Sequence, residues 1–220
     1  MVRRLIVNAD DYGLCASVNS AVEELIDAGR LGDVSVLANG VLWESAVLFL
    51  NERPQISAGV HLNAVEGKPI SSASEVQILT GADGTFTGLR KLMMRWIRHP
   101  FAVTRAVEIE WRAQMERLLG TGLRLSHADS HQHLHAFPPA WNCALKLCRE
   151  YGVASLRLPL ERNRLPMRRA GVWGLGASLA VSTRIVSGKS LHHNNHFLGF
   201  KRAGAYGLKE LIDDLRELPP

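Results

Sequence analysis

The sequence contains few cysteines and no long apolar run, and each shortage excludes a class of protein. Three of the 220 residues are cysteine, and Cys15, Cys143 and Cys148 form no Cys-x-x-Cys pair. This sparse, odd set argues against a disulfide framework and favours reduced thiols that serve in packing. No stretch reaches the roughly 18 consecutive apolar residues that a membrane-spanning helix needs. The apolar run after the N-terminal arginines covers only residues 5–7, so we predict a buried strand there, no signal peptide and a cytoplasmic protein.

Positive charge is in excess, with a formal net charge of +5 and a sequence pI near 9.4, which favours an anionic partner. Much of the excess lies at residues 90–105 and 157–169, and neither stretch contains a nucleic-acid-binding module, so we expect no nucleic-acid partner. The first stretch also carries large apolar residues, namely Met93, Met94, Trp96, Ile97 and Phe101. We interpret it as a solvated helix with its apolar face on the core. The alternative is a basic amphipathic surface in peripheral contact with a membrane. The oligomeric state stays open, with a homodimer as one alternative.

Strand and helix patterns alternate along most of the chain. Strands are predicted at residues 4–9, 33–38, 57–62, 123–128 and 154–158. Helices are predicted at residues 17–29, 43–52, 89–97, 102–119, 139–151 and 208–218. A long connection with turn signals spans residues 63–87, and residues 160–205 are basic and irregular. The alternation predicts one α/β domain over residues 1–220, with helices packed on a parallel sheet that is either open or closed into a barrel.

The number of predicted strands falls short of a complete barrel. A full (β/α)₈ barrel takes about 250 residues, and only five strands are convincing here. The last predicted helix ends at Pro219-Pro220 with no strand after it, although such a helix normally returns the chain to the sheet. We therefore expect a C-terminally truncated domain that lacks its last strand or strands.

Four histidines and an aspartate recur at intervals of two in one segment: His127, Asp129, His131, His133 and His135. On an extended chain such residues share one face, with successive members about 6.6 Å apart. Packing alone explains this row poorly, because every buried imidazole needs a hydrogen-bond partner. A metal ion, the groups around it and a substrate would supply those partners. The alternative is a histidine-rich surface tract.

Two further polar clusters follow predicted strands, at the sheet edge where α/β proteins bind ligands. Asp10 and Asp11 follow the first strand, and His61 ends the third. Adjacent carboxylates raise each other's pKa unless a cation lies between them. The alternative for the aspartate pair is a turn with a helix cap. Imidazoles and a carboxylate suit Zn²⁺, and Mg²⁺ if waters complete an octahedron. Such an ion polarises a carbonyl and lowers the pKa of bound water, whose proton a second aspartate can take.

Three motifs together resemble the YdjC-like carbohydrate deacetylases: NADDYG at 8–13, GVHLN at 59–63 and SHADSHQHLH at 126–135, with DGTF at 83–86 as a weaker match. The resemblance implies a distorted (β/α) barrel that removes acetyl groups from N-acetylated sugars. By the same resemblance, Asp11, His61 and His131 bind the metal and Asp10 is the general base. The residues expected to contact the substrate or to surround the ligands are Asn63, His127, Asp129, His133 and His135.

The family resemblance leaves several points open. Family members are often described with Mg²⁺, whereas the ligand set alone favours Zn²⁺. Landmarks at residues 106–123 resemble a branch associated with hopanoid biosynthesis, which acts on a glycosylated lipid, so the substrate is either an N-acetylated oligosaccharide or a glycolipid. Family members usually continue into a strand with a His-Pro pair whose histidine is a candidate general acid. Because this chain ends at Pro220, that acid is missing or is replaced by a residue such as His133.

Two other functions are compatible with the same residues. Asp and His ligand sets also serve metal-dependent phosphoesterases and amidohydrolases, which usually hold two metals about 3.5–4 Å apart. A truncated, non-catalytic sugar- or lipid-binding protein is the third alternative.

Overall fold

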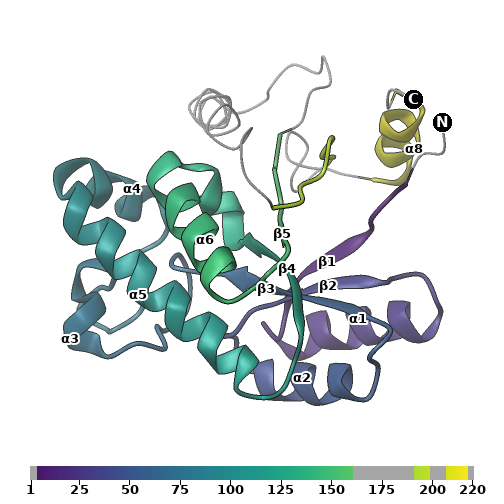
Figure 1. Cartoon of the computed structure of the whole chain (residues 1–220), viewed down its shortest axis with the longest axis horizontal. Coiled ribbons are helices and arrows are strands. Elements are labelled where there is room, and N and C mark those ends of the chain that lie inside the picture. The colour runs from purple at the N-terminus through teal and green to yellow at the C-terminus, as the bar shows by residue number, and fades with distance from the viewer. Residues whose placement is uncertain (1–3, 161–190, 199–206, 218–220) are drawn as a thin grey trace.

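The computed structural model describes residues 4–160, 191–198 and 207–217 (Figure 1). The strands are β1 (Asn8–Tyr12), β2 (Asp33–Val36), β3 (Ser57–Leu62), β4 (Leu125–Ser130) and β5 (Ser155–Leu156). The α-helices are α1 (Ala16–Asp27), α2 (Trp43–Asn51), α3 (Ala73–Val76), α4 (Leu89–Arg98), α5 (Pro100–Leu119), α6 (Pro138–Glu150) and α8 (Leu208–Glu217). Two 3₁₀ helices are η1 (Gln77–Leu79) and η2 (His131–Ala136). No helix among these described residues is long and apolar enough to cross a membrane.

The sheet confirms the predicted α/β class. All its strand pairs are parallel, and each strand pairs with the next one in the chain, in the order β1-β2-β3-β4-β5. An order without reversal is that of a barrel wall, whereas doubly wound sheets reverse their order at a switch point. The helices α1, α2 and α5 lie below the strands in Figure 1, with α6 beside them. Because all the strands run parallel, their carboxyl ends meet at one edge of the sheet.

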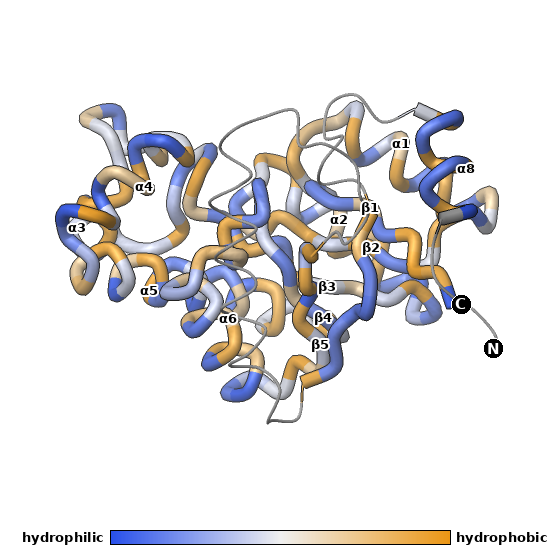
Figure 2. The backbone as a smooth tube through the Cα atoms, turned by 90° about the horizontal axis from the view of Figure 1, so that it is seen from above, coloured by the Kyte–Doolittle hydropathy of each residue, from blue (hydrophilic) through white to orange (hydrophobic). Residues whose placement is uncertain are grey.

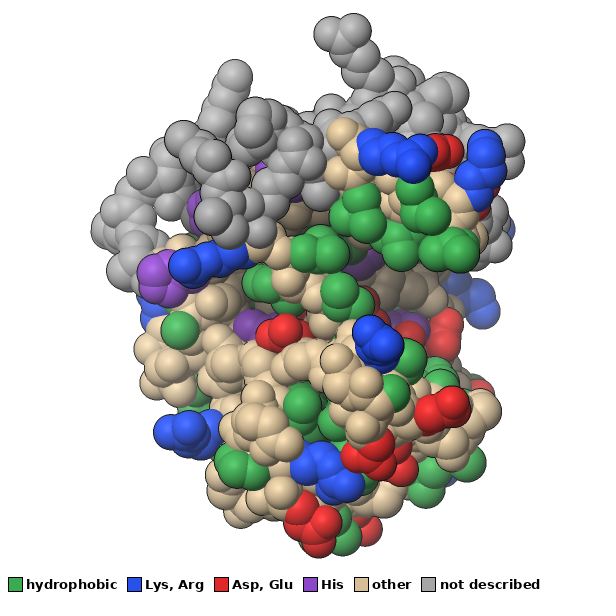
Figure 3. Space-filling view, turned by 90° about the vertical axis from the view of Figure 1, so that its right-hand side faces the viewer, with side chains coloured by type: hydrophobic (Ala, Val, Ile, Leu, Met, Phe, Trp, Pro, Cys, Tyr) green, Lys and Arg blue, Asp and Glu red, His purple; other side chains and the backbone are tan. Residues whose placement is uncertain are grey.

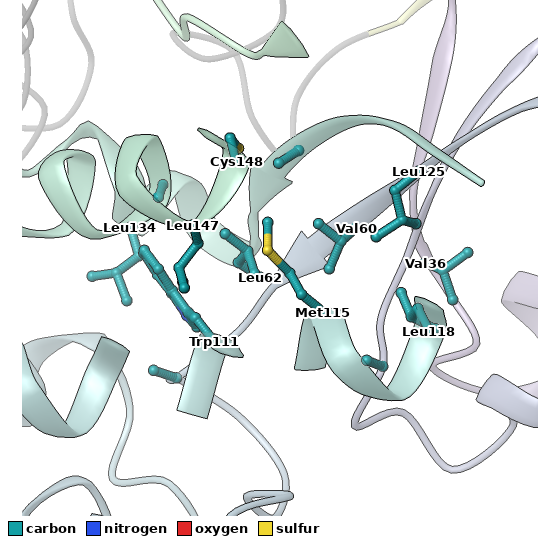
Figure 4. Close-up of a cluster of buried hydrophobic side chains, with 14 of the residues drawn as sticks. Val36, Val60, Leu62, Trp111, Met115, Leu118, Leu125, Leu134, Leu147 and Cys148 are labelled. Carbon is teal, nitrogen blue, oxygen red and sulfur yellow. The ribbon is translucent and has the colours of Figure 1, made fainter. Parts of the chain in front are cut away.

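The core lies between the sheet and α5 and α6. From α5, Trp111, Met115 and Leu118 are fully buried, at the spacing that places residues on one helix face. They pack toward aliphatic side chains of β2, β3 and α6, including Val36, Val60, Leu62 and Leu147 (Figure 4). Hydrophobic and hydrophilic residues alternate along these helices in Figure 2. Cys143 and Cys148 are free and buried, which confirms packing as the role of these two thiols.

Some predicted boundaries were wrong. The first strand runs over Asn8–Tyr12, and residues 5–7, predicted to be buried, are 59%, 69% and 52% exposed, because no described element covers them. Helix α1 begins at Ala16, and its N-cap residue is Cys15, which has an extended backbone. The cap therefore lies two residues before Ser17, where it was predicted. The predicted connection at 63–87 contains α3, η1 and a bridge between Thr80 and Phe86. Of the unassigned residues 160–205, all but 160 and 191–198 lie outside the described residues.

Candidate active site

A break in β1 allows both adjacent aspartates to face the same site. Successive residues of a regular strand point to opposite faces, so Asp10 and Asp11 would normally diverge. The pairing of β1 with β2 shifts between Ala9 and Tyr12, and Asp11 has a left-handed φ of 61°. This bulge turns Asp11 toward the carboxyl end of β3, while Asp10 remains on the face of Asn8, whose Nδ2 donates to Asp10 Oδ1 over 2.7 Å.

Asp11, His61 and His131 come together at the carboxyl ends of β1, β3 and β4. Asp11 Oδ1 lies 2.7 Å from His131 Nδ1 and 3.1 Å from His61 Nε2. The ligand atoms of all three residues lie within 4.8 Å of one another, which is compatible with one divalent cation among them. Burial alone raises the pKa of Asp11, but the hydrogen bonds with His131 and His61 hold it far below its usual value. The site therefore favours a charged carboxylate beside two ring nitrogens.

Asp129 fixes the orientation of His61. The Asp129 carboxylate is fully buried on β4, and its Oδ1 lies 2.6 Å from His61 Nδ1. Its Oδ2 accepts a hydrogen bond from Ser35 Oγ over 2.7 Å and pairs with Arg157 at 2.5 Å. Burial lowers the pKa of His61, but the Asp129 charge and the hydrogen bonds with Asp11 and Asp129 together outweigh burial and raise the pKa to about 10. A carboxylate behind a histidine in this way sets which ring nitrogen is free to bind a cation.

Arg157 is a site residue that the sequence analysis missed. It follows β5, and its NH1 and NH2 groups donate to Asp10 Oδ2 and Oδ1, each over 2.7 Å. NH2 also reaches Asp129, so one guanidinium joins β1, β4 and β5. The sequence places Arg157 in a predicted strand, at the start of the basic stretch at residues 157–169, and indicates no role for it in the site. The sequence signal that could have indicated such a residue is Asp129, because a buried carboxylate requires a cationic partner.

His127 lies across β3 from the residues it contacts. In a flat sheet, side chains two strands apart are about 10 Å apart, yet His127 Nε2 on β4 lies 3.1 Å from Ser35 Oγ on β2. The same nitrogen lies 3.1 Å from Asn8 Oδ1 on β1. The sheet is therefore strongly curved, and Gly59 on β3 leaves the space that the ring occupies. Burial lowers the pKa of His127, so it acts as a neutral hydrogen-bonding group.

Gly59→Ala is expected to destabilise the protein by about 1–3 kcal/mol, the usual effect of overpacking. A Cβ at this position would lie 2.3 Å from His127 Nε2, so the ring and its partners would have to move. Urea unfolding measures the change. Gly32→Ala is the matched control, because its Cβ would meet no heavy atom within 4 Å. Equal stability of the two variants would contradict the assigned role of Gly59.

The predicted row of histidines on one face was wrong beyond β4. The strand ends at Ser130, and Gln132 and His133 adopt left-handed conformations with φ of 50° and 54°. The chain then turns into η2. The His133 ring lies 5.3 Å from the ring of Phe197, and burial is the main reason that its pKa is lowered to about 4.

His135 is directed away from the cation ligands. It is fully buried, stacks on Trp141 and bonds with Ser130 Oγ. Its Nε2 lies 2.9 Å from the backbone oxygen of Arg157, and burial lowers its pKa to about 3. A neutral His135 therefore supports the backbone that carries Arg157 and lies behind the site.

Asn63 also lies outside the cluster. Its side chain is buried, and its Oδ1 accepts hydrogen bonds from the backbone N–H groups of Val65 and Glu66 over 2.8 and 3.2 Å. Its Nδ2 donates to Asn39 Oδ1 and to the Glu66 backbone oxygen. The structure thus gives Asn63 the task of shaping the loop after β3, and its predicted contact with ligands or substrate stays a prediction.

The cluster occupies an accessible face. Acidic and histidine side chains gather in a recess across the middle of the face shown in Figure 3. The side chains of Asp10 and Asp11 are 34% and 30% exposed, whereas Asp129 is fully buried. Small molecules from solvent can therefore reach the two aspartates, with the buried network beneath them.

The family model described as "YdjC-like protein" matches residues 4–220. The chain belongs to the YdjC-like family. It is 36% identical over 150 residues to a carbohydrate deacetylase of Brevibacillus brevis, covering 68% of this chain and 57% of that one. It is 34% identical over 166 residues to the human carbohydrate deacetylase, covering 73% of this chain and 50% of the human one. It is 29% identical over 214 residues to the carbohydrate deacetylase of Vibrio vulnificus, covering 97% of this chain and 73% of that one.

This YdjC-like chain also resembles a solved structure in fold. A crystal structure from Enterococcus faecalis, provisionally named a cellobiose-phosphate cleavage protein, matches with a TM-score of 0.71 at 22% identity. The match covers 96% of this chain and 74% of that one. The chain spans only 57%, 63% and 50% of the carbohydrate deacetylases of Brevibacillus brevis, Oceanobacillus iheyensis and human.

Proposed function

We propose that this chain carries the active site of a carbohydrate deacetylase, which hydrolyses the acetamide of an N-acetylated amino sugar. The observation that carries the proposal is the meeting of Asp11, His61 and His131 beside Asp10, in a member of a family whose curated relatives are named carbohydrate deacetylases. Asp11, His61 and His131 would hold one divalent cation, Mg²⁺ or Zn²⁺. Such an ion supplies Lewis-acid polarisation of the acetyl carbonyl and lowers the pKa of water.

Asp10 is the general base in this proposal. Arg157 holds both of its oxygens at 2.7 Å, and the 34% exposure of the side chain leaves it accessible to water. Asp10 accepts a proton from water as the water oxygen attacks the acetyl carbon. The C–N bond then breaks as the leaving nitrogen takes a proton back from protonated Asp10, so that acetate and an amine are released. Arg157 and Asn8 fix the carboxylate in place, which is a requirement for efficient proton transfer.

The position of Arg157 favours one cation over two. A second group, formed by Asp10, His61 and Asp129, also brings ligand atoms within 4.8 Å. The Arg157 guanidinium pairs with both of those carboxylates, at 2.7 and 2.5 Å, and so occupies the position of a second cation. Two-metal phosphoesterases need both ions. The arrangement therefore supports a single-metal deacetylase.

The surface of α4 and the start of α5 bears on the substrate class. Met94, Ile97 and Phe101 are 41%, 77% and 90% exposed. Exposed basic residues lie in the same segment, namely Arg90, Lys91, Arg98 and Arg105. Exposed apolar side chains among cations suit the surface of an anionic membrane. We therefore include a lipid-linked N-acetylated sugar beside free oligosaccharides as a proposed substrate.

Acetate release tests the proposal. The protein is stripped of cations with a chelator and assayed with N-acetylglucosamine oligomers and with an N-acetylglucosaminyl lipid in anionic vesicles. We expect release that depends on added Mg²⁺ or Zn²⁺, with at least a tenfold difference between the stripped and loaded protein. The two substrates distinguish a free sugar from a lipid-linked one. Bound cation without acetate from any N-acetylated sugar would contradict the proposed reaction.

A further inference from the structure

The outer nitrogen of His131 faces a carboxylate that no motif had indicated. His131 is 9% exposed, and its Nε2 is buried without a hydrogen-bond partner in the described part of the chain. Glu66 Oε2 lies 3.5 Å from this nitrogen, within ion-pair distance. The other carboxylate oxygen, Oε1, accepts a hydrogen bond from Gln132 Nε2 over 2.8 Å. Glu66 thus contacts the two consecutive residues that follow β4.

Several hydrogen bonds fix the backbone of Glu66. The Asn63 side chain accepts a hydrogen bond from the backbone N–H of Glu66 and donates one, over 2.8 Å, to the backbone oxygen of Glu66. Asn39 Nδ2 donates to the same oxygen over 3.1 Å. Gln114 on α5 in turn bonds with both the N–H and the oxygen of Asn63, at 2.8 and 2.6 Å. These contacts explain why Asn63 is turned away from the cluster, and they hold Glu66 beside His131.

The two histidines are arranged alike. His61 has Asp11 at one ring nitrogen and Asp129 at the other, and His131 has Asp11 at one and Glu66 at the other. Histidines that bind metals almost always donate their second N–H to a carboxylate, a carbonyl or water. Asp129 is fully buried, whereas Glu66 is 56% exposed, so the two partners differ in how firmly they hold their ring.

We infer that Glu66 is a positioning residue for the cation: it accepts the Nε2–H of His131 and so holds Nδ1, with its lone pair free, toward Asp11. The inference rests on the proposed function in that a cation occupies the Asp11, His61 and His131 group. A small rotation of the exposed Glu66 side chain converts the 3.5 Å ion pair into a hydrogen bond. Glu66 itself does not touch the substrate in this role.

Cation affinity tests the inference, using Glu66→Gln in the full chain. The glutamine keeps an oxygen for Gln132 but removes the charge, so the loop is expected to remain folded. Calorimetric titration with Zn²⁺ and Mg²⁺ should show 10–100-fold weaker binding than the wild type, the range found when such partners are removed. The unfolding temperature of the cation-free protein should not change. Glu24→Gln, at an exposed position on α1, is the control and should bind like the wild type.

The outcomes separate this inference from the proposed function. Affinity of Glu66→Gln within twofold of the wild type overturns the role of Glu66 and leaves the deacetylase proposal standing. Weakened cation binding in Glu66→Gln, together with a wild type that releases no acetate, supports the inference and contradicts only the reaction. A wild type that binds neither Zn²⁺ nor Mg²⁺ overturns the inference and the cation site together. Nitrogen-15 spectra of the Zn²⁺-loaded protein provide a second readout, because His131 should carry its proton on Nε2.

Discussion

Asp11→Asn is expected to abolish cation binding and acetate release together while the fold stays intact. Asp11 contributes the only carboxylate of the proposed ligand group, and its Oδ1 lies within 3.1 Å of both histidine nitrogens. A neutral amide oxygen is a much weaker ligand for a divalent cation. We expect affinity to fall by more than about 100-fold, beyond the effect of removing an outer partner. Calorimetric titration and an acetate assay measure the two losses.

Asparagine is the informative replacement because of the backbone at this position. The left-handed φ of 61° is tolerated by asparagine but costs other residues roughly 1–2 kcal/mol. Asp11→Ala should therefore lose stability as well as the cation, whereas Asp11→Asn should lose only the cation. Asp27→Asn, whose side chain is 60% exposed, controls for the loss of one negative charge. Cation affinity in Asp11→Asn equal to that of the wild type would place the ion elsewhere, with Asp10, His61 and Asp129 as the next group to test.

The location of the site could be predicted from the sequence because it follows from periodic patterns. Alternating strand and helix signals imply a parallel sheet, and a parallel sheet brings the residues that follow its strands to one edge. Asp10, Asp11, His61 and His131 were all found in this way, and they do meet in the structure. Their assignment as base and ligands came from the family resemblance, and it remains a prediction.

Features that carry no local sequence signal, or that depend on contacts distant in sequence, could not be predicted. The turn after Ser130 occurs at Gln132 and His133, which carry no glycine or proline signal, so an extended continuation was expected. The bulge that turns Asp11 toward His61 likewise lies in a segment without glycine. Arg157 reaches Asp10 across 147 positions of the chain, and only the curvature of the sheet brings them together. The secondary-structure propensity of a short segment contains no information on contacts between residues so far apart in sequence.

Asp10→Asn is expected to separate cation binding from turnover. Asp10 lies outside the proposed ligand group, so the affinity for Zn²⁺ or Mg²⁺ should stay close to that of the wild type. Acetate release at saturating cation should fall by roughly 10²–10⁴-fold, the usual contribution of a general base. The asparagine oxygen can still accept one hydrogen bond from Arg157, which also keeps its pair with Asp129, so the network beneath the site should persist.

The contrast between the two aspartate variants is the decisive comparison. Asp11→Asn should lose both the cation and turnover, and Asp10→Asn should lose turnover alone, although the two residues are adjacent in sequence. Turnover of Asp10→Asn within tenfold of the wild type would show that another group takes the proton from water. Weakened cation binding in Asp10→Asn would instead make this residue a ligand, and the guanidinium of Arg157 would then have to move to admit the ion. The bulge in β1 is what gives the neighbouring carboxylates separate partners, and therefore separate roles.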